Sequence, residues 1–255
     1  MATKAQLKFV KSLSLKKNRQ NAGVFVAEGT KCVEDLLASS SGVKELYAVK
    51  DWLTNTTAAI PPTAVVCEVT ERELSAMSEL TTANRVLALV AIPDHRLDIS
   101  ALKGKLVIGL DDIQDPGNLG SILRLCDWFG IFDVIASRTT VDCFNAKVVQ
   151  ATMGSIARVR VHYRDDIART VAEIKATGMP VYATALEGDN IYQARLPSAA
   201  LVFFGNESAG LNPELLAQCQ HRVRIPHFNP NINKAESLNV AIATGIVCSE
   251  FRRRG

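Results

Sequence analysis

Short apolar runs alternate with helical patterns through the second half of the sequence, and this limits the possible folds more than any other feature. From Lys105 onward, runs typical of buried strands are separated by segments of helical periodicity. The predicted strands cover residues 106–110, 134–136, 159–161, 181–185, 201–204 and 223–225. The predicted helices cover residues 118–129, 144–152, 165–177, 213–218 and 237–253. Such alternation predicts an α/β domain with a mainly parallel sheet covered by helices.

A smaller set of strand and helix patterns precedes this domain. Its predicted strands are 24–27, 45–49, 64–69 and 86–92, and its predicted helices are 29–38 and 71–80. The segment 93–104 begins with a proline, carries several charges and has no sustained periodicity, which is typical of a linker. We therefore predict a small α/β domain at residues 1–94, a linker at 95–104 and a second domain at 105–255.

Composition and cysteine usage exclude several classes of protein. The chain has 255 residues, 47% of them hydrophobic, which is enough for substantial cores. No apolar run approaches the roughly 18 residues that a membrane span needs, and the lysine-rich N-terminus lacks the features of a signal peptide. The six cysteines are scattered singly, without a CxxC pair or histidines at zinc-like spacing. We expect a cytoplasmic protein with reduced cysteines, no metal site and no membrane association.

Basic residues are concentrated at the N-terminus, although the net charge is only +3. The first 19 residues contain no acidic residue and six basic ones, namely Lys4, Lys8, Lys11, Lys16, Lys17 and Arg19. A basic arm on a nearly neutral protein favours contact of these six residues with a polyanion such as a nucleic acid. The alternative is the solvated face of a helix, because Leu7, Val10 and Leu13 give residues 2–17 a weak apolar stripe.

The stretch "DDIQDPGNLGSILRLCDWFG" (111–130) begins a helix in an unusual way. Asp115 is a good N-cap and the following proline suits the first helical position, so the helix should begin there and present free N–H groups that favour an anion. Gly117 and Gly120 permit close approach of a partner. Arg124 lies one to two turns further on, where it can hold a phosphate with two hydrogen bonds. A solvent-exposed arginine without a ligand is the alternative.

The stretch "FFGNESAGL" (203–211) is the second candidate site. A glycine at the end of a strand lets a ligand contact the backbone, and Asn206 and Glu207 add polar groups beside it. The stretch matches neither the GxGxxG pattern nor the phosphate-binding P-loop pattern, which disfavours sites for NAD or ATP. A loop that only caps a helix is the alternative.

The stretch "SLNVAIATGIVCSEF" (237–251) is apolar or small on nearly every face. Such a helix is buried on most sides, and a second copy of the chain is the simplest additional surface, so we predict a symmetric homodimer. Ser237 and Asn239 stand at the start of this helix, where they are either caps or ligand-binding groups.

Five motifs together carry a family resemblance. "DPGNLGSILRLCDWFG", "ATMGSIARV", "FFGNESAGL", "VRIP" and "SLNVAIATGI" resemble, in order and spacing, the motifs of the SpoU (TrmH-type) family of RNA ribose 2′-O-methyltransferases in the SPOUT superfamily. The resemblance covers about residues 105–253. Residues 18–37 resemble the start of the substrate-binding domain that is often fused ahead of the catalytic domain and is similar in fold to a ribosomal RNA-binding protein.

The resemblance implies a fold and an activity. It implies a deep trefoil knot in the C-terminal domain, S-adenosylmethionine as cofactor and methyl transfer to a ribose 2′-hydroxyl. The N-terminal extension favours ribosomal RNA over transfer RNA as the substrate. A catalytically silent RNA-binding protein of the same fold is the alternative, whereas a nicotinamide-dependent enzyme lacks its glycine fingerprint here.

The resemblance also implies roles for individual residues. Cofactor contacts are implied for Ala185, Gly205, Asn206, Ile225 and Leu238. Catalytic roles are implied for Arg124, Asn118, Glu207, Ser237 and Asn239. Because arginine normally stays protonated in proteins, we expect Arg124 to hold the phosphate and stabilise the developing alkoxide, and Glu207 to act as the base or to brace its loop. The loop "HFNPNINKAE" (227–236) departs from the family by its length and by its lack of methionine and glycine.

Overall fold

The computed structural model describes residues 2–80, 84–229 and 236–254. The chain forms two compact units. The first comprises Met1–Asp94 and Asp142–Arg158, and the second comprises His95–Val141 and Val159–Gly255. Residues 142–158 were placed in the C-terminal domain from the sequence, yet their contacts belong to the first unit. Residues 230–235 of the long loop lie outside the described residues.

The first unit is built on a four-stranded sheet in the order β1-β4-β2-β3. Strand β4 is antiparallel to β1 and β2, whereas β2 and β3 are parallel. The strands are β1 (Val24–Glu28), β2 (Val43–Ala48), β3 (Val65–Glu68) and β4 (Val86–Ala91). The predicted strands are thus confirmed, and so is a small α/β unit at the N-terminus.

The helices of the first unit differ from the sequence prediction at its beginning. They are α1 (Lys4–Ser12), α2 (Lys16–Ala22), α3 (Thr30–Ala38), α4 (Lys50–Asn55) and α5 (Glu71–Met77). The weak apolar stripe over residues 2–17 does not lie on one helix, because the chain turns after Ser12 and buries Leu13 in the core at 1% exposure. Helix α4 was not predicted, since its six residues contain a single buried side chain, Trp52.

Residues 142–158 pack against the first unit through pairs that lie far apart in the sequence. They contain α7 (Ala146–Ala151) and the short 3₁₀ helix η2 (Ser155–Ala157). The rings of Phe25 and Phe144 lie 4.8 Å apart. Arg19, 3% exposed, forms an ion pair with Asp142 at 2.5 Å and donates to the carbonyl of Leu13 at 2.8 Å. Sequence periodicity predicts that a helix forms but not which sheet it packs on.

The second unit is built on a six-stranded sheet in the order β10-β8-β9-β5-β6-β7, and all neighbouring strands are parallel. The strands are β5 (Leu106–Leu110), β6 (Asp133–Ser137), β7 (Arg160–Arg164), β8 (Val181–Asn190), β9 (Ala200–Phe204) and β10 (His221–Arg224). Strands β5, β6 and β9 are buried along their whole length, as expected for the centre of a parallel sheet with both faces covered. The predicted mainly parallel α/β sheet is confirmed.

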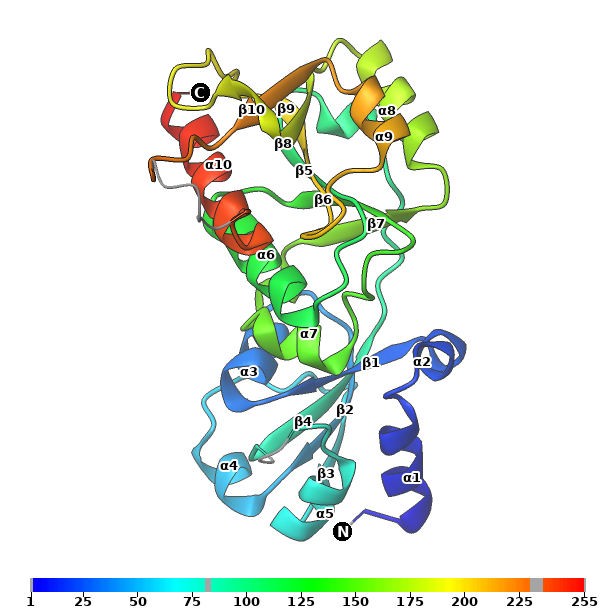
Figure 1. Cartoon of the computed structure of the whole chain (residues 1–255). Helices are drawn as coiled ribbons and strands as arrows, with labels where there is room; N and C mark the ends of the chain where they lie inside the picture. The colour runs from blue at the N-terminus through cyan, green and yellow to red at the C-terminus, as the bar shows by residue number, and fades with distance from the viewer. Residues whose placement is uncertain (1, 81–83, 230–235, 255) are drawn as a thin grey trace. The chain divides into compact units, whose positions relative to one another are not determined.

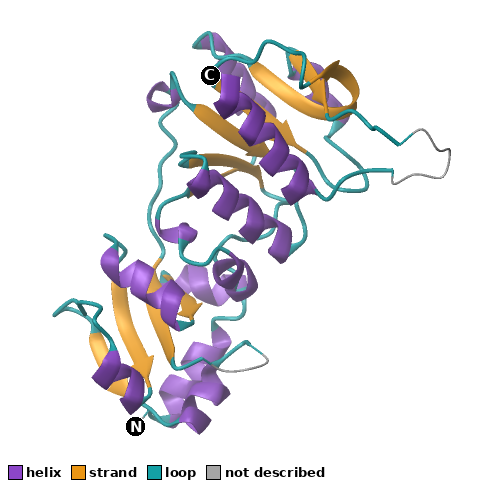
Figure 2. Ribbon diagram, turned by 90° about the vertical axis from the view of Figure 1, so that its left-hand side faces the viewer, coloured by secondary structure: helices purple, strands orange, loops and turns teal. Residues whose placement is uncertain are grey.

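Helices α6 and α10 lie side by side in the second unit (Figures 1 and 2). The helical elements of this unit are η1 (Ser100–Leu102), α6 (Pro116–Trp128), α8 (Ile167–Ala176), α9 (Pro213–Gln218) and α10 (Val240–Arg254). A β-carbon at Gly245 of α10 would lie 3.4 Å from the Leu125 side chain of α6. A β-carbon there would be in ordinary van der Waals contact with Leu125, so α10 packs closely on α6 at this position.

All six cysteines are free, and four of them are buried. Burial raises the pKa of Cys248 to about 12 and that of Cys219 to about 11, so both thiols stay protonated at neutral pH. No helix in the described ranges is long and apolar enough to cross a membrane.

Candidate active site

The loops that follow β5 and β9 meet at the carboxyl edge of the parallel sheet. The two strands are neighbours, with Leu110 of β5 opposite Phe204 of β9. Just beyond them, the Asp111 N–H donates to the Phe204 carbonyl at 2.9 Å, and Asp111 Oδ2 accepts from the Asn212 N–H at 2.9 Å. This edge is where open parallel sheets bind their ligands.

Helix α6 begins as predicted. Asp115 Oδ1 accepts from the Asn118 N–H at 2.7 Å, and Pro116 is the first helical residue. Gly117 is exposed, but Gly120 is buried in the unit. Gly117 is therefore accessible to a partner at the surface of the unit, whereas Gly120 is not.

A cavity of about 300 Å³ is lined by the loop after β9, by β8 and the end of β10, and by the first turns of α10. All five residues for which the resemblance implied cofactor contacts line this cavity. Its lining residues are Thr184, Ala185, Leu186, Phe204, Gly205, Asn206, Glu207, Ser208, Ala209, Gly210, Val223, Ile225, Ser237, Leu238, Val240, Ala243 and Val247. The volume is at the lower end of the range of small-molecule sites, roughly 300–1,000 Å³.

Gly205 is required by the loop that it begins. A β-carbon there would lie 2.3 Å from the carbonyl carbon of Gly210 and from the backbone nitrogen of Leu211. The loop closes through two backbone hydrogen bonds between Asn206 and Gly210, of 3.0 and 2.8 Å. From the sequence, contact with a ligand was the reason for a glycine at this position. In the structure, the backbone of Gly210 and Leu211 already leaves no room for a side chain.

The Asn206 side chain shapes the same loop. Its Oδ1 accepts from the N–H groups of Ser208 at 2.9 Å and Ala209 at 3.1 Å. Its Nδ2 donates to both the carbonyl and the carboxylate of Asp112. Asn206 thus lines the cavity while its own polar atoms bind the protein.

Asn118, Glu207 and Asn239 form a hydrogen-bonded triad that joins α6, the loop after β9 and the start of α10. Asn239 Nδ2 donates to Asn118 Oδ1 at 2.9 Å and to Glu207 Oε1 at 3.5 Å, and Asn118 Nδ2 also donates to Glu207 Oε1. Asn239 Oδ1 caps α10 by accepting from the N–H groups of Ala241 and Ile242. Asn239 is therefore both a cap and a member of the site, and Ser237 lines the cavity beside it.

Arg124 lies on the exposed face of α6, beside a second, shallower cavity of about 470 Å³. It makes no hydrogen bond or ion pair with any residue that the structure describes. Asn118 and Asn239 line this second cavity, whereas Glu207 lines the first, so the triad connects the two. Trp128 and Ile242 also line the second cavity, and they are 86% and 58% exposed.

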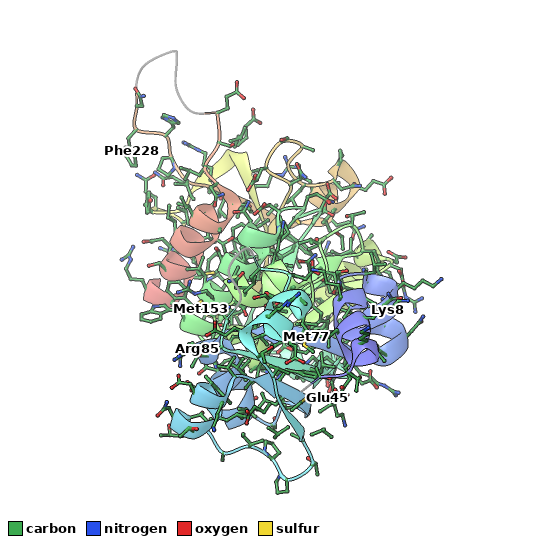
Figure 3. The ribbon with its side chains drawn as sticks, turned by 90° about the horizontal axis from the view of Figure 1, so that it is seen from below. Lys8, Glu45, Met77, Arg85, Met153 and Phe228 are labelled. Atoms are coloured by element: carbon green, nitrogen blue, oxygen red, sulfur yellow. The ribbon has the colours of Figure 1, made fainter. Side chains whose placement is uncertain are left out.

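The five lysines of the N-terminal arm, Lys4, Lys8, Lys11, Lys16 and Lys17, are exposed, and Figure 3 shows Lys8 on α1. Lys11 also forms an ion pair with Glu79 at 3.0 Å. Arg19 differs from the lysines, because its guanidinium is buried against Asp142. We therefore leave Arg19 out of the proposed RNA-binding surface.

A model of the SpoU rRNA methylase family matches residues 105–249, which is more than half of the chain. The chain belongs to the SpoU family. A model of the MRM3-like substrate binding domain matches residues 4–88. Both matches confirm the resemblance that the sequence motifs indicated.

Individual relatives agree with this assignment. The 23S rRNA (guanosine(2553)-2′-O)-methyltransferase RlmP of Bacillus subtilis is 34% identical over 257 residues, which cover 98% of this chain and 97% of the relative. A TrmH-family structure from Porphyromonas gingivalis superimposes with a TM-score of 0.91 at 36% identity and covers all of both chains. An AdoMet-bound rRNA methyltransferase from Sinorhizobium meliloti gives a TM-score of 0.82 at 31% identity, covering 99% of this chain and 97% of that one.

Two residues of this SpoU-family site were missed by the sequence analysis. Asp111 and Asp112 follow β5 directly and hold the loop after β9 by side-chain hydrogen bonds. The available signal was a pair of carboxylates immediately after a buried strand of a parallel sheet. Among the described residues, no group of three or more histidine, cysteine, aspartate or glutamate side chains is placed to hold a metal ion.

Proposed function

We propose that this chain transfers the methyl group of S-adenosylmethionine to a ribose 2′-hydroxyl of ribosomal RNA. One observation carries the proposal: a single cavity contains all five implied cofactor residues and is linked by a hydrogen-bonded triad to the exposed Arg124. Ribosomal rather than transfer RNA is supported by the match of residues 4–88 to a substrate-binding domain and by the relative RlmP, whose name gives 23S rRNA as its substrate.

The chemistry of the cavity walls suits S-adenosylmethionine. Phe204, Val223 and Val247 provide apolar surface for a ring, while Thr184 and Ser237 add hydroxyl groups. The loop from Gly205 to Gly210 contributes exposed backbone. When bound, the cofactor supplies an electrophilic methyl group on a positively charged sulfur.

The residues around the cavity contribute mainly orientation. Ile225 and Leu238 line one side of the cavity, and the loop after β9 lines another. Holding methyl group and hydroxyl in line can lower the barrier by roughly 7–11 kcal/mol. Glu207 Oε1 accepts from two amide groups, so we assign Glu207 to bracing Asn118 and Asn239 at the junction of the two cavities.

Arg124 is the residue that we assign to the RNA backbone. A guanidinium binds phosphate with two parallel hydrogen bonds, and its positive charge stabilises the alkoxide that develops on the ribose. The hydroxyl proton passes to water as the oxygen–methyl bond forms, the sulfur–methyl bond breaks and S-adenosylhomocysteine leaves. Arg124 suits this role because it lacks a partner among the described residues. The exposed N-terminal lysines supply further phosphate contacts, and we assign RNA binding to residues 1–94 and catalysis to residues 105–141 and 159–255.

The proposal extends to assembly, topology and location. We propose a symmetric homodimer in which Trp128 and Ile242, exposed on neighbouring helices, contact a second copy of the chain. We retain the deep trefoil knot implied by the family resemblance. We place the enzyme in the cytoplasm because its proposed substrate is found there.

Methyl transfer in vitro tests the proposed activity. Purified protein, ribosomal RNA and S-adenosylmethionine with an isotope-labelled methyl group should yield a labelled 2′-O-methylnucleoside after complete digestion of the RNA. Calorimetry should show binding of S-adenosylhomocysteine, the demethylated product, and no binding of NAD or ATP. Labelling of transfer RNA alone would refute the substrate, and absence of binding to either sulfur compound would refute the cofactor.

A further inference from the structure

Asp112 has a backbone conformation that is uncommon for residues other than glycine, although aspartate tolerates it better than most. Its φ is +57°, in the left-handed region that favours glycine. It directly follows Asp111 at the end of β5, at the edge of the sheet where the cavity lies. A residue is kept in such a conformation only when its surroundings hold it there, and such residues gather at functional sites.

Hydrogen bonds hold every polar group of Asp112. Its N–H donates to Ser137 Oγ at 2.9 Å, and its Oδ1 accepts from Gln114 Nε2 at 2.5 Å. Its carbonyl oxygen and its Oδ2 both accept from Asn206 Nδ2, at 3.0 and 3.1 Å. The left-handed turn therefore points two acceptors at one amide group, 94 positions further along the chain.

Asn206 connects Asp112 to the wall of the cavity by hydrogen bonds. Its Oδ1 binds the N–H groups of Ser208 and Ala209, so the amide that Asp112 fixes also fixes the turn over residues 206–210. That turn lines the cavity and includes Glu207 of the triad. Asp111 fixes the far end of the same loop through the Asn212 N–H.

We propose that Asp112 is a positioning residue that sets the conformation of the cofactor loop through Asn206. The inference rests on the proposed function, in which this loop borders S-adenosylmethionine. A glycine at position 112 would adopt the same φ without strain and keep the carbonyl acceptor, but it would lose Oδ2. The carboxylate is thus the reason for an aspartate at a position whose backbone favours glycine.

Three substitutions distinguish the effect of losing the carboxylate from the effect of relieving the backbone strain. Asp112→Ala removes the carboxylate and keeps the strain, Asp112→Gly removes both, and Asp112→Asn keeps an oxygen that can accept from Asn206. The matched control is Asp165→Asn, because Asp165 is a surface carboxylate of the same unit with 83% of its side chain exposed. The measurements are the Kd for S-adenosylhomocysteine by calorimetry, the KM for S-adenosylmethionine, the Tm, and hydrogen exchange at the amides of Ser208 and Ala209.

We expect Asp112→Ala and Asp112→Gly to raise the Kd and the KM roughly 10- to 100-fold, since each removes a hydrogen bond to a charged acceptor. Amide exchange at Ser208 and Ala209 should become faster in both variants. Asp112→Gly should melt at a higher temperature than Asp112→Ala, because it relieves the strain. Asp112→Asn should lie closest to the parent, and Asp165→Asn should match it.

Two results would overturn the inference. One is a Kd and an exchange rate for Asp112→Gly equal to those of the parent. The other is a lower Tm in Asp112→Ala with the Kd and the KM unchanged, which would mean a purely structural role. If the parent itself failed to bind S-adenosylhomocysteine, the proposed function would be wrong, and amide exchange at Ser208 and Ala209 would then decide the role of Asp112 alone.

Discussion

Arg124 lies on the exposed face of α6 and contributes no hydrogen bond or ion pair to the described part of the fold. We predict that Arg124→Ala lowers kcat about 10²- to 10³-fold, the effect of losing one group that stabilises transition-state charge, while the Kd for S-adenosylmethionine and the Tm stay near the parent values. Arg124→Lys should be nearly as impaired, because lysine offers only a point charge. Arg169→Ala, at another exposed arginine of the same unit, is the control. Substantial activity in Arg124→Lys would refute two-point phosphate recognition.

Individual residues also show how much of the site could be predicted from the sequence. The five cofactor residues implied by the motifs all line one cavity, and the three motifs meet in the triad of Asn118, Glu207 and Asn239. Asp112 escaped notice because its role depends on a positive φ and on a partner far away in the sequence. Gly205 was noticed, but its physical reason became clear only from the path of the chain that returns over it.

At the scale of elements, α6 and α10 leave an apolar surface around Trp128 and Ile242. We predict that Trp128→Glu turns the homodimer into a monomer, because a buried charge without a partner is strongly unfavourable in an apolar interface. Sedimentation equilibrium would measure the mass. Val65→Glu is the control, since Val65 is an exposed valine of β3 outside this surface. A parent protein with the mass of one chain at micromolar concentration would contradict the prediction.

The apolar pattern of α10 predicted burial without revealing its origin. Val240, Val247, Cys248 and Phe251 are already buried within one chain, so most of the pattern serves the fold of the second unit. On α10 itself, the exposed Ile242 is the large apolar side chain that still argues for a second copy, together with Trp128 of α6. An apolar sequence pattern predicts that a helix face is buried. It does not show whether the same chain or a second chain buries it.

Asp133 is the first residue of β6, and its side chain links this strand to β7. Its carboxylate accepts from Arg160 Nη2 at 2.7 Å and faces His162 Nε2 at 2.9 Å. Burial opposes the charge, but the hydrogen bonds from His162 and Arg160 outweigh it and hold the pKa of Asp133 well below its usual range. A lowered folded-state pKa stabilises the protein above the unfolded pKa of about 3.9, and this contribution is lost as the pH falls towards the folded value.

We therefore predict that Asp133→Asn lowers the free energy of unfolding at neutral pH by about 1.5–3 kcal/mol, the range for hydrogen bonds to a charged group. The difference from the parent should narrow at about pH 3, where the parent loses part of the same stabilisation. Urea unfolding at the two pH values measures both effects, with the exposed Asp165→Asn as control. An equal difference at both pH values would show that the charge of Asp133 is not the cause.

At the scale of the whole molecule, the two compact units are not consecutive segments, because residues 142–158 fold with the first. Deleting residues 1–94 would expose the buried side chains of Val148 and Val149, so truncation is a poor test of RNA binding. The exposed lysines of the arm provide a better one. The division of a chain into units depends on pairs such as Phe25 with Phe144, which no local pattern encodes.

We predict that replacing Lys4, Lys8 and Lys17 together by glutamine weakens RNA binding and flattens its salt dependence. The log–log slope should fall by about 0.7 for each RNA phosphate that these lysines no longer neutralise. Cofactor affinity should not change. The control replaces three exposed lysines outside the arm, Lys44, Lys50 and Lys103. An unchanged slope in the arm variant would mean that these lysines are only a solvated helix face.

Ribose methylation of ribosomal RNA is the central claim, and mapping 2′-O-methyl groups on total RNA from cells with and without this protein tests it most directly. We predict that one 2′-O-methyl group in ribosomal RNA disappears when the protein is absent and returns when the parent sequence, but not the Arg124→Ala variant, is restored. An unchanged map of ribosomal RNA, or a restored group with the Arg124→Ala variant, would contradict the account.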